Sequence, residues 1–189
     1  MIPYGRQNVN QNDIDAVITV LKSPNLTQGY NVPEFEQSLA KYVGAKYAVA
    51  VNSATSALHI AYLALGINNK SRVWTTPITF VATSNAALMC GASIDFVDID
   101  KETANICPLK LENKLMIAEK KGETPDLVVV VHLGGYSSDM KSIWNLSKKY
   151  NFKIVEDASH AVGGKYMGHT IGCCKYSNIT IFSFHPVKI

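Results

Sequence analysis

Cysteine is scarce in this sequence of 189 residues, which has four cysteines and no C-x-x-C pair. Neither a disulfide framework nor a zinc site is therefore indicated, and the thiols are expected to be reduced, as in a cytoplasmic protein. Four histidines also lack the spacing of metal ligands: His132, His160, His169 and His185. The sequence predicts no metal site.

Long apolar segments are missing too. The run LVVVV at 127–131 is far too short to cross a bilayer, and the N-terminus lacks the pattern of a signal peptide. The net charge is only +3 and the basic residues are scattered. We therefore expect a cytoplasmic globular protein with neither a membrane nor a nucleic acid as partner.

Strand-like and helix-like segments alternate along the chain. The expected helices cover residues 14–21, 35–43, 54–65, 79–89, 108–121 and 139–150, and the expected strands residues 47–53, 72–76, 93–99, 127–133, 152–157 and 178–184. This alternation predicts an α/β fold, a mostly parallel sheet with helices on both faces. Ligands bind beyond the carboxyl ends of the strands in such sheets.

The segment NSATSAL (52–58) leads from an expected strand into a helix. The backbone amides of Ala54 and Thr55 at that helix start form a potential phosphate site. An ordinary helix cap by Ser53 or Thr55 explains the same residues. No G-x-G-x-x-G or Walker A pattern occurs, which argues against a Rossmann-type protein that binds NAD or a nucleoside triphosphate.

Two further segments carry reactive groups at expected strand ends. In EDASHAVG (156–163), Asp157 and His160 can point into one cavity, where a buried carboxylate needs a cationic partner. A local helix-cap role for Asp157 stays open. In FSFHPVK, Lys188 could react with a carbonyl, or it could be an ordinary solvated lysine. A phosphate site, a carboxylate and a reactive lysine together predict pyridoxal 5'-phosphate as the cofactor.

The segments LTQG (26–29), NSATSAL, TTPITFVATSNA (75–86), EDASHAVG and FSFHPVK resemble, in this order, the DegT/DnrJ/StrS family of sugar-nucleotide aminotransferases. The resemblance implies the fold of aspartate aminotransferase (fold type I), with residues 1–189 as the N-terminal part of the large domain and the C-terminal small domain absent. Three of the segments are most similar to family members of pseudaminic acid biosynthesis.

The resemblance also implies a role for each site residue. Lys188 would bind the cofactor covalently and relay a proton, Asp157 would hold its ring nitrogen protonated, and His160 would lie near its phenolic oxygen. The remaining expected contacts are Ala54, Thr55 and Ser183 to the phosphate, Phe80 stacked on the ring, and His185 near the substrate.

The implied reaction transfers an amino group from L-glutamate to a 4-keto-6-deoxy UDP-sugar, in a homodimeric enzyme. Some relatives of the same fold dehydrate sugars and carry histidine in place of the lysine, so Lys188 favours transamination. The alternative is a catalytically inactive fragment of such an enzyme, which at most binds the cofactor weakly.

Overall fold

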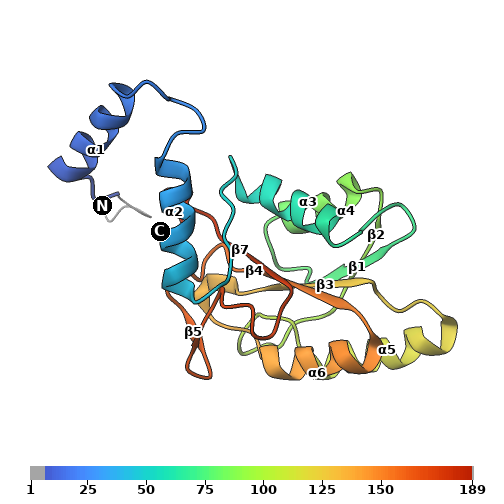
Figure 1. The fold of residues 1–189 in the computed structure, drawn as a ribbon. Coiled ribbons are helices and arrows are strands. Elements are labelled where there is room, and N and C mark those ends of the chain that lie inside the picture. The colour runs from blue at the N-terminus through green and yellow to red at the C-terminus, as the bar shows by residue number, and fades with distance from the viewer. Residues whose placement is uncertain (1–6, 189) are drawn as a thin grey trace, which may run out of the picture.

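The computed structural model describes residues 7–188 and has a five-stranded sheet at its centre (Figure 1). The strands of this sheet are β1 (Arg72–Thr75), β2 (Ser93–Phe96), β3 (Leu127–Val131), β4 (Lys153–Asp157) and β7 (Ile179–Ile181). Their order is β2-β1-β3-β4-β7 and every neighbouring pair is parallel. A separate antiparallel hairpin consists of β5 (Lys165–Tyr166) and β6 (His169–Thr170).

Helices cover both faces of the sheet. The helices are α1 (Gln11–Leu21), α2 (Asn31–Val43), α3 (Ala54–Ala64), α4 (Ala82–Met89), α5 (Pro108–Lys121) and α6 (Met140–Tyr150), with a 3-10 turn η1 (Leu133–Gly135). In Figure 1, α3 and α4 lie above the sheet and α5 and α6 below it. Each layer has its own apolar core. The predicted parallel α/β fold is thus confirmed.

Local sequence explains several elements directly. All five residues of β3 are buried, as expected for a central strand with helices on both faces. Helix α5 begins with Pro108, which needs no hydrogen-bond partner for its nitrogen there. It ends at Gly122, whose φ of 68° lies in the left-handed region that glycine adopts without strain.

One predicted strand is wrong. Residues 47–53 form no strand, and Tyr47 and Val49 are 75% and 80% exposed. This segment runs beside α2 instead, where the Glu36 carboxylate accepts a hydrogen bond from the Ala50 amide (2.8 Å). An alternating apolar pattern becomes a strand only where a neighbouring strand offers free backbone groups.

The expected strand 178–184 is also shorter than predicted, because β7 ends at Ile181. The Ile181 carbonyl accepts the Ala158 amide at 2.8 Å, one residue after β4 ends. Beyond this bond β7 has no partner, so residues 182–188 follow an irregular path. This path leaves Ser183 and Lys188 free to approach the carboxyl edge of the sheet.

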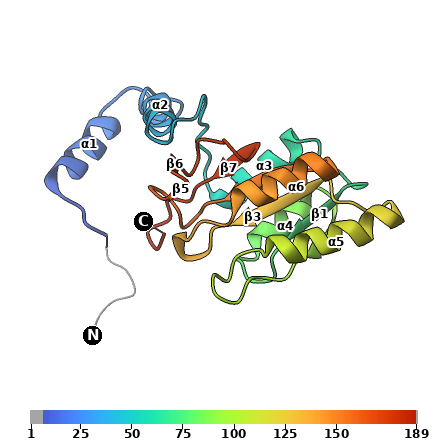
Figure 2. The same ribbon diagram turned by 90° about the horizontal axis from the view of Figure 1, so that it is seen from below.

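Helix α1 forms as predicted but stands apart from the sheet, as Figure 2 shows. Its cap is Asn10, whose side chain accepts the Asn12 amide (2.8 Å). No α1 residue is buried, and the apolar side chains of Val17 and Leu21 are 58% and 64% exposed.

Among residues 7–188, no helix is both long enough and apolar enough to span a bilayer.

Candidate functional site

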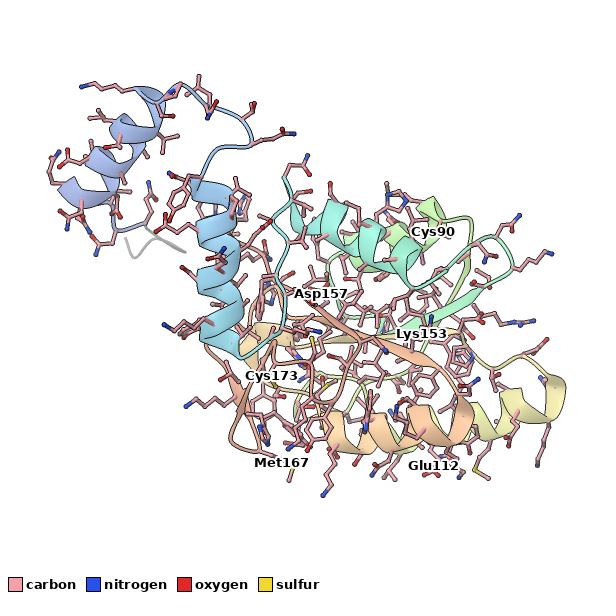
Figure 3. All side chains as sticks on the ribbon, in the orientation of Figure 1. Cys90, Glu112, Lys153, Asp157, Met167 and Cys173 are labelled. Carbon is pink, nitrogen blue, oxygen red and sulfur yellow. The ribbon has the colours of Figure 1, made fainter. Side chains whose placement is uncertain are left out.

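Asp157 lies at the carboxyl end of β4, where it is 5% exposed. Its Oδ2 accepts the hydroxyl of Thr83 (2.7 Å), and its Oδ1 accepts the hydroxyl of Ser159 (2.6 Å). Figure 3 shows Asp157 in the interior, at the opposite end of its strand from Lys153. No cation pairs with this carboxylate among residues 7–188. Because an unpaired buried charge is costly, the carboxylate is suited to a cationic ligand.

The negative charge of Asp157 affects the pKa of a buried tyrosine, Tyr62. Burial, and next the charge of Asp157, raise the pKa of Tyr62 well above its usual value. The Tyr62 hydroxyl donates to the Thr83 carbonyl (2.9 Å), so helix α3 is tied to α4 directly above the carboxylate. Thr83 is completely buried. It was not identified as a site residue from the sequence, because it is one of four threonines in the segment 75–86 and nothing distinguishes it from the others.

His160 and Lys188 are brought together from positions 28 residues apart. The Lys188 Nζ lies 2.7 Å from Nε2 of His160, and it is 5.9 Å from the centre of the Phe80 ring. Partial burial and the neighbouring charge of Lys188 lower the pKa of His160, although Asp157 acts in the opposite direction. The uncharged ring is therefore favoured near neutral pH.

The start of α3 offers free backbone donors. The Ser53 side chain accepts the Ser56 amide (3.1 Å), which confirms that Ser53 caps this helix. The amides of Ala54 and Thr55 have no acceptor within the described part of the chain. Ser183 is 8% exposed and follows β7, which packs beside α3. A helix start with free amides is suited to an anion.

His185 is joined to the site through its backbone, because its amide donates to Ser183 Oγ (3.4 Å) and its carbonyl accepts the Lys188 amide (2.8 Å). Its ring is exposed, and its Nδ1 accepts the Val187 amide at 3.4 Å. Among residues 7–188, there is no group of three or more histidine, cysteine, aspartate or glutamate side chains that could hold a metal ion.

A second buried cluster lies next to the site and was not predicted. The Ser138 amide donates to His132 Nδ1 (3.2 Å), so the ring proton sits on Nε2 and is donated to Glu156 (2.8 Å). Glu156 also accepts the hydroxyls of Ser177 and Thr180. Burial alone would raise the pKa of Glu156, but the hydrogen bonds from His132, Ser177 and Thr180 outweigh it and lower the pKa.

The lowered pKa of Glu156 predicts an acid-sensitive contribution to stability. Such a carboxylate stabilises the fold above its unfolded pKa of about 4.3, and the contribution is lost as the pH falls through the folded value. Glu156→Gln is expected to lower the free energy of unfolding at neutral pH by about 1–3 kcal/mol and to flatten its dependence below about pH 4.3. Urea unfolding over a pH series measures both effects.

The matched control is Glu112→Gln, which removes an exposed carboxylate paired with Lys149 (3.2 Å). Exposed ion pairs contribute about 0–1 kcal/mol, so this variant should keep the acid sensitivity of the wild type. An equal flattening in both variants would contradict the assignment to Glu156.

The comparison with known families decides the classification. The DegT/DnrJ/EryC1/StrS aminotransferase family matches residues 7–189. The chain belongs to this family. Membership agrees with the resemblance carried by the sequence segments, and it covers every residue of the candidate site.

Individual members of the DegT/DnrJ/EryC1/StrS family are similar over the whole chain. A UDP-4-amino-4,6-dideoxy-N-acetyl-beta-L-altrosamine transaminase of Campylobacter jejuni is 50% identical over 100% of this chain and 48% of its own length. The spore coat polysaccharide biosynthesis protein SpsC of Bacillus subtilis is 40% identical over 99% of this chain and 46% of its own. The chain therefore spans about half the length of the curated relatives that it matches.

Solved structures agree with the predicted fold. Helicobacter pylori PseC, an aminotransferase involved in pseudaminic acid biosynthesis, matches with a TM-score of 0.87 at 36% identity, over 98% of this chain and 48% of its own. The PLP-form of a Streptococcus pneumoniae protein described as a sugar aminotransferase gives 0.88 at 28% identity, over 99% and 50%. The expected fold of the aspartate aminotransferase type is confirmed.

Proposed function

We propose that this chain is the N-terminal part of the large domain of a pyridoxal phosphate-dependent aminotransferase. The enzyme transfers an amino group from L-glutamate to a 4-keto-6-deoxy UDP-sugar in the biosynthesis of surface glycans. The observation that carries this proposal is the buried carboxylate of Asp157, which has no cationic partner in residues 7–188, at the same sheet edge as Lys188.

The residues present fit pyridoxal phosphate. When bound, the cofactor supplies a carbonyl carbon that takes up amines and an aromatic ring that accepts electron density. Asp157 would hold a proton on the ring nitrogen, since the two hydroxyls and the Ser159 amide (3.3 Å) that donate to it leave a carboxylate lone pair free. Thr83 and Ser159 keep the carboxylate oriented.

The phosphate group is held at the start of α3. The free amides of Ala54 and Thr55 and the positive end of the helix dipole attract the anion, and the Ser183 hydroxyl adds a donor. Phe80 is 68% exposed and lies near Lys188, so its ring is available to cover the cofactor ring.

Lys188 and His160 handle the reacting centre. Lys188 would hold the cofactor and would move a proton to and from the substrate carbon, which requires an amine with a free lone pair. His160, whose Nε2 lies 2.7 Å from Lys188 Nζ, would donate to an oxygen of the cofactor. We assign His185 to the substrate side, since its exposed ring follows Ser183 on the same irregular segment.

The substrate class rests on the named relatives. The Campylobacter jejuni relative is a transaminase named for a UDP-linked 4-amino-4,6-dideoxy sugar, which is the amine that a 4-keto-6-deoxy UDP-sugar would yield. PseC belongs to pseudaminic acid biosynthesis. We further propose a homodimeric enzyme of the cytoplasm.

A second candidate is a chain that binds the cofactor without turnover. Large apolar side chains are exposed close to the site, with Phe80 68%, Val81 57% and Phe184 49% exposed. Surfaces of this kind are typical of contacts with further protein, and the chain spans about half the length of its relatives. In this case the cofactor attaches to Lys188, but L-glutamate is not consumed.

Reduction with borohydride after incubation with pyridoxal phosphate tests the proposal. Peptide mapping is expected to find the pyridoxyl group on Lys188 in preference to exposed lysines such as Lys46. Label spread evenly over the exposed lysines would contradict both candidates. Formation of 2-oxoglutarate from L-glutamate by the loaded chain separates the aminotransferase from the non-catalytic binder.

A further inference from the structure

The buried side-chain amide of Asn105 forms hydrogen bonds with both ends of the loop that follows β3. Asn105, between β2 and α5, is 2% exposed. Its Oδ1 accepts the Leu133 amide (3.0 Å), and its Nδ2 donates to the Tyr136 carbonyl (2.8 Å). The loop of residues 133–136 is therefore held in one conformation by a side chain 28 residues earlier in the sequence. No role was assigned to Asn105 from the sequence.

The same loop contacts His160 through its backbone. The Gly134 amide donates to His160 Nδ1 at 3.3 Å. Gly135 approaches even more closely, because a Cβ placed on it would lie 2.8 Å from the His160 carbonyl oxygen. Both glycines have positive φ (60° and 84°), so the loop takes a path that most residues would disfavour.

This contact determines which nitrogen of His160 carries the proton. A neutral imidazole has one donor and one acceptor nitrogen. If Nδ1 accepts from Gly134, the proton must sit on Nε2, the nitrogen that lies 2.7 Å from Lys188 Nζ. The Lys188 nitrogen can face this N–H only as an uncharged amine, because an ammonium has no lone pair to accept a hydrogen bond. Without the Gly134 contact, the Lys188 nitrogen could itself donate to Nε2 and the ring proton would move to Nδ1.

We propose that Asn105 is a positioning residue, whose clamp on residues 133–136 aims the Gly134 amide at His160 and thereby fixes the ring proton on Nε2. His160 then acts as a hydrogen-bond donor toward the reacting centre, and toward the Lys188 nitrogen when that nitrogen is uncharged. The inference rests on the proposed function for the importance of this donor, but the tautomer itself is a property of the chain without cofactor. The groups that act on the ring electrostatically are Lys188 and Asp157.

Nuclear magnetic resonance of the chain labelled with ¹⁵N-histidine tests the proposal without cofactor. At about pH 11, above the usual pKa of histidine (about 6.5) and of lysine (about 10.4), the ring is neutral, no ammonium competes for Nε2, and the two ring nitrogen shifts identify the tautomer. His160→Gln identifies the signals by their loss. The wild type is expected to show His160 protonated at Nε2, whereas Asn105→Asp should shift it toward the form protonated at Nδ1.

Asn105→Asp keeps the size of the side chain and removes the donor to the Tyr136 carbonyl. Asn68→Asp is the matched control, because Asn68 also donates to one backbone carbonyl (Gly66, 2.9 Å) and accepts one amide (Lys70, 3.0 Å). Asn68 precedes β1, at the other end of the sheet, so this variant should leave the His160 tautomer unchanged.

A second pair of variants moves the loop directly. Gly135→Ala places a methyl group against the His160 carbonyl, whereas an added Cβ at Gly134 has no atom within 4 Å. Both positions have positive φ, so the two alanines carry similar backbone strain and differ in the contact. Gly135→Ala is expected to shift the tautomer as Asn105→Asp does, and Gly134→Ala to preserve it.

The inference is overturned if wild-type His160 is protonated at Nδ1, or if Asn105→Asp and Gly135→Ala both keep the wild-type tautomer. Neither result would affect the proposed function, which depends on attachment of the cofactor to Lys188. Conversely, labelling spread over exposed lysines would remove the proposed function while the tautomer measurement still stood. The two failures are therefore distinguishable.

Discussion

Lys188→Ala is expected to abolish the specific attachment of pyridoxal phosphate to this chain. Lys188 is partly buried, with Nζ 2.7 Å from His160 Nε2 and close to the face of Phe80. These contacts hold the amine in one place beside His160 and Phe80, which raises its effective concentration toward a cofactor bound there. The imine absorbance and the borohydride-stable label should both fall to the background of exposed lysines.

The matched control for this variant is Lys175→Ala. The Lys175 Nζ lies 2.6 Å from Nε2 of His169, so the chain contains a second lysine–histidine pair of similar geometry. Lys175 lies after the β5–β6 hairpin, away from the free amides of α3. If loss of Lys175 reduced the specific label as much as loss of Lys188, a lysine–histidine pair alone would explain the reactivity and the proposed site would be wrong.

Asp157→Asn is expected to change binding and stability in opposite directions. A hydrogen bond to a charged group contributes about 1.5–3 kcal/mol, so the affinity for pyridoxal phosphate should fall by about 10- to 100-fold. The chain without cofactor should gain about 1 kcal/mol of unfolding free energy, because a buried charge without a cationic partner is removed. The Thr83 and Thr79 hydroxyls, 2.9 Å apart, can reorient to bind the new amide.

Asp139→Asn is the control variant for Asp157→Asn. Asp139 also accepts two hydroxyls, from Ser142 and Tyr166 (both 2.6 Å), but it caps α6 on the other face of the sheet. This variant should lose stability and leave cofactor binding unchanged, the reverse of Asp157→Asn. Titration of the cofactor absorbance and urea unfolding measure the two quantities. A parallel loss of both in Asp157→Asn would mean that the carboxylate is structural.

Local patterns predicted the central elements well because their signals are strong. The five apolar residues of β3, and the bounds of α5 between Pro108 and Gly122, follow from burial and from the backbone preferences of proline and glycine. The strand expected at 47–53 did not form, and the strand expected at 178–184 ended at Ile181, because strand formation depends on a partner. Whether a neighbouring strand offers free backbone groups is not encoded in the segment itself.

The sequence by itself determined the parallel α/β fold and the reactive groups at its strand ends, namely Asp157, Lys188 and the start of α3. These follow from periodicity and from the side-chain chemistry, which are local properties. Only the tertiary structure decided which atoms meet. It buried Asp157 beneath Thr83, paired Lys188 with His160, and placed Asn105 over the loop that contacts His160. Such contacts join residues 28 to 74 positions apart, and packing of the whole chain, rather than any segment, determines them.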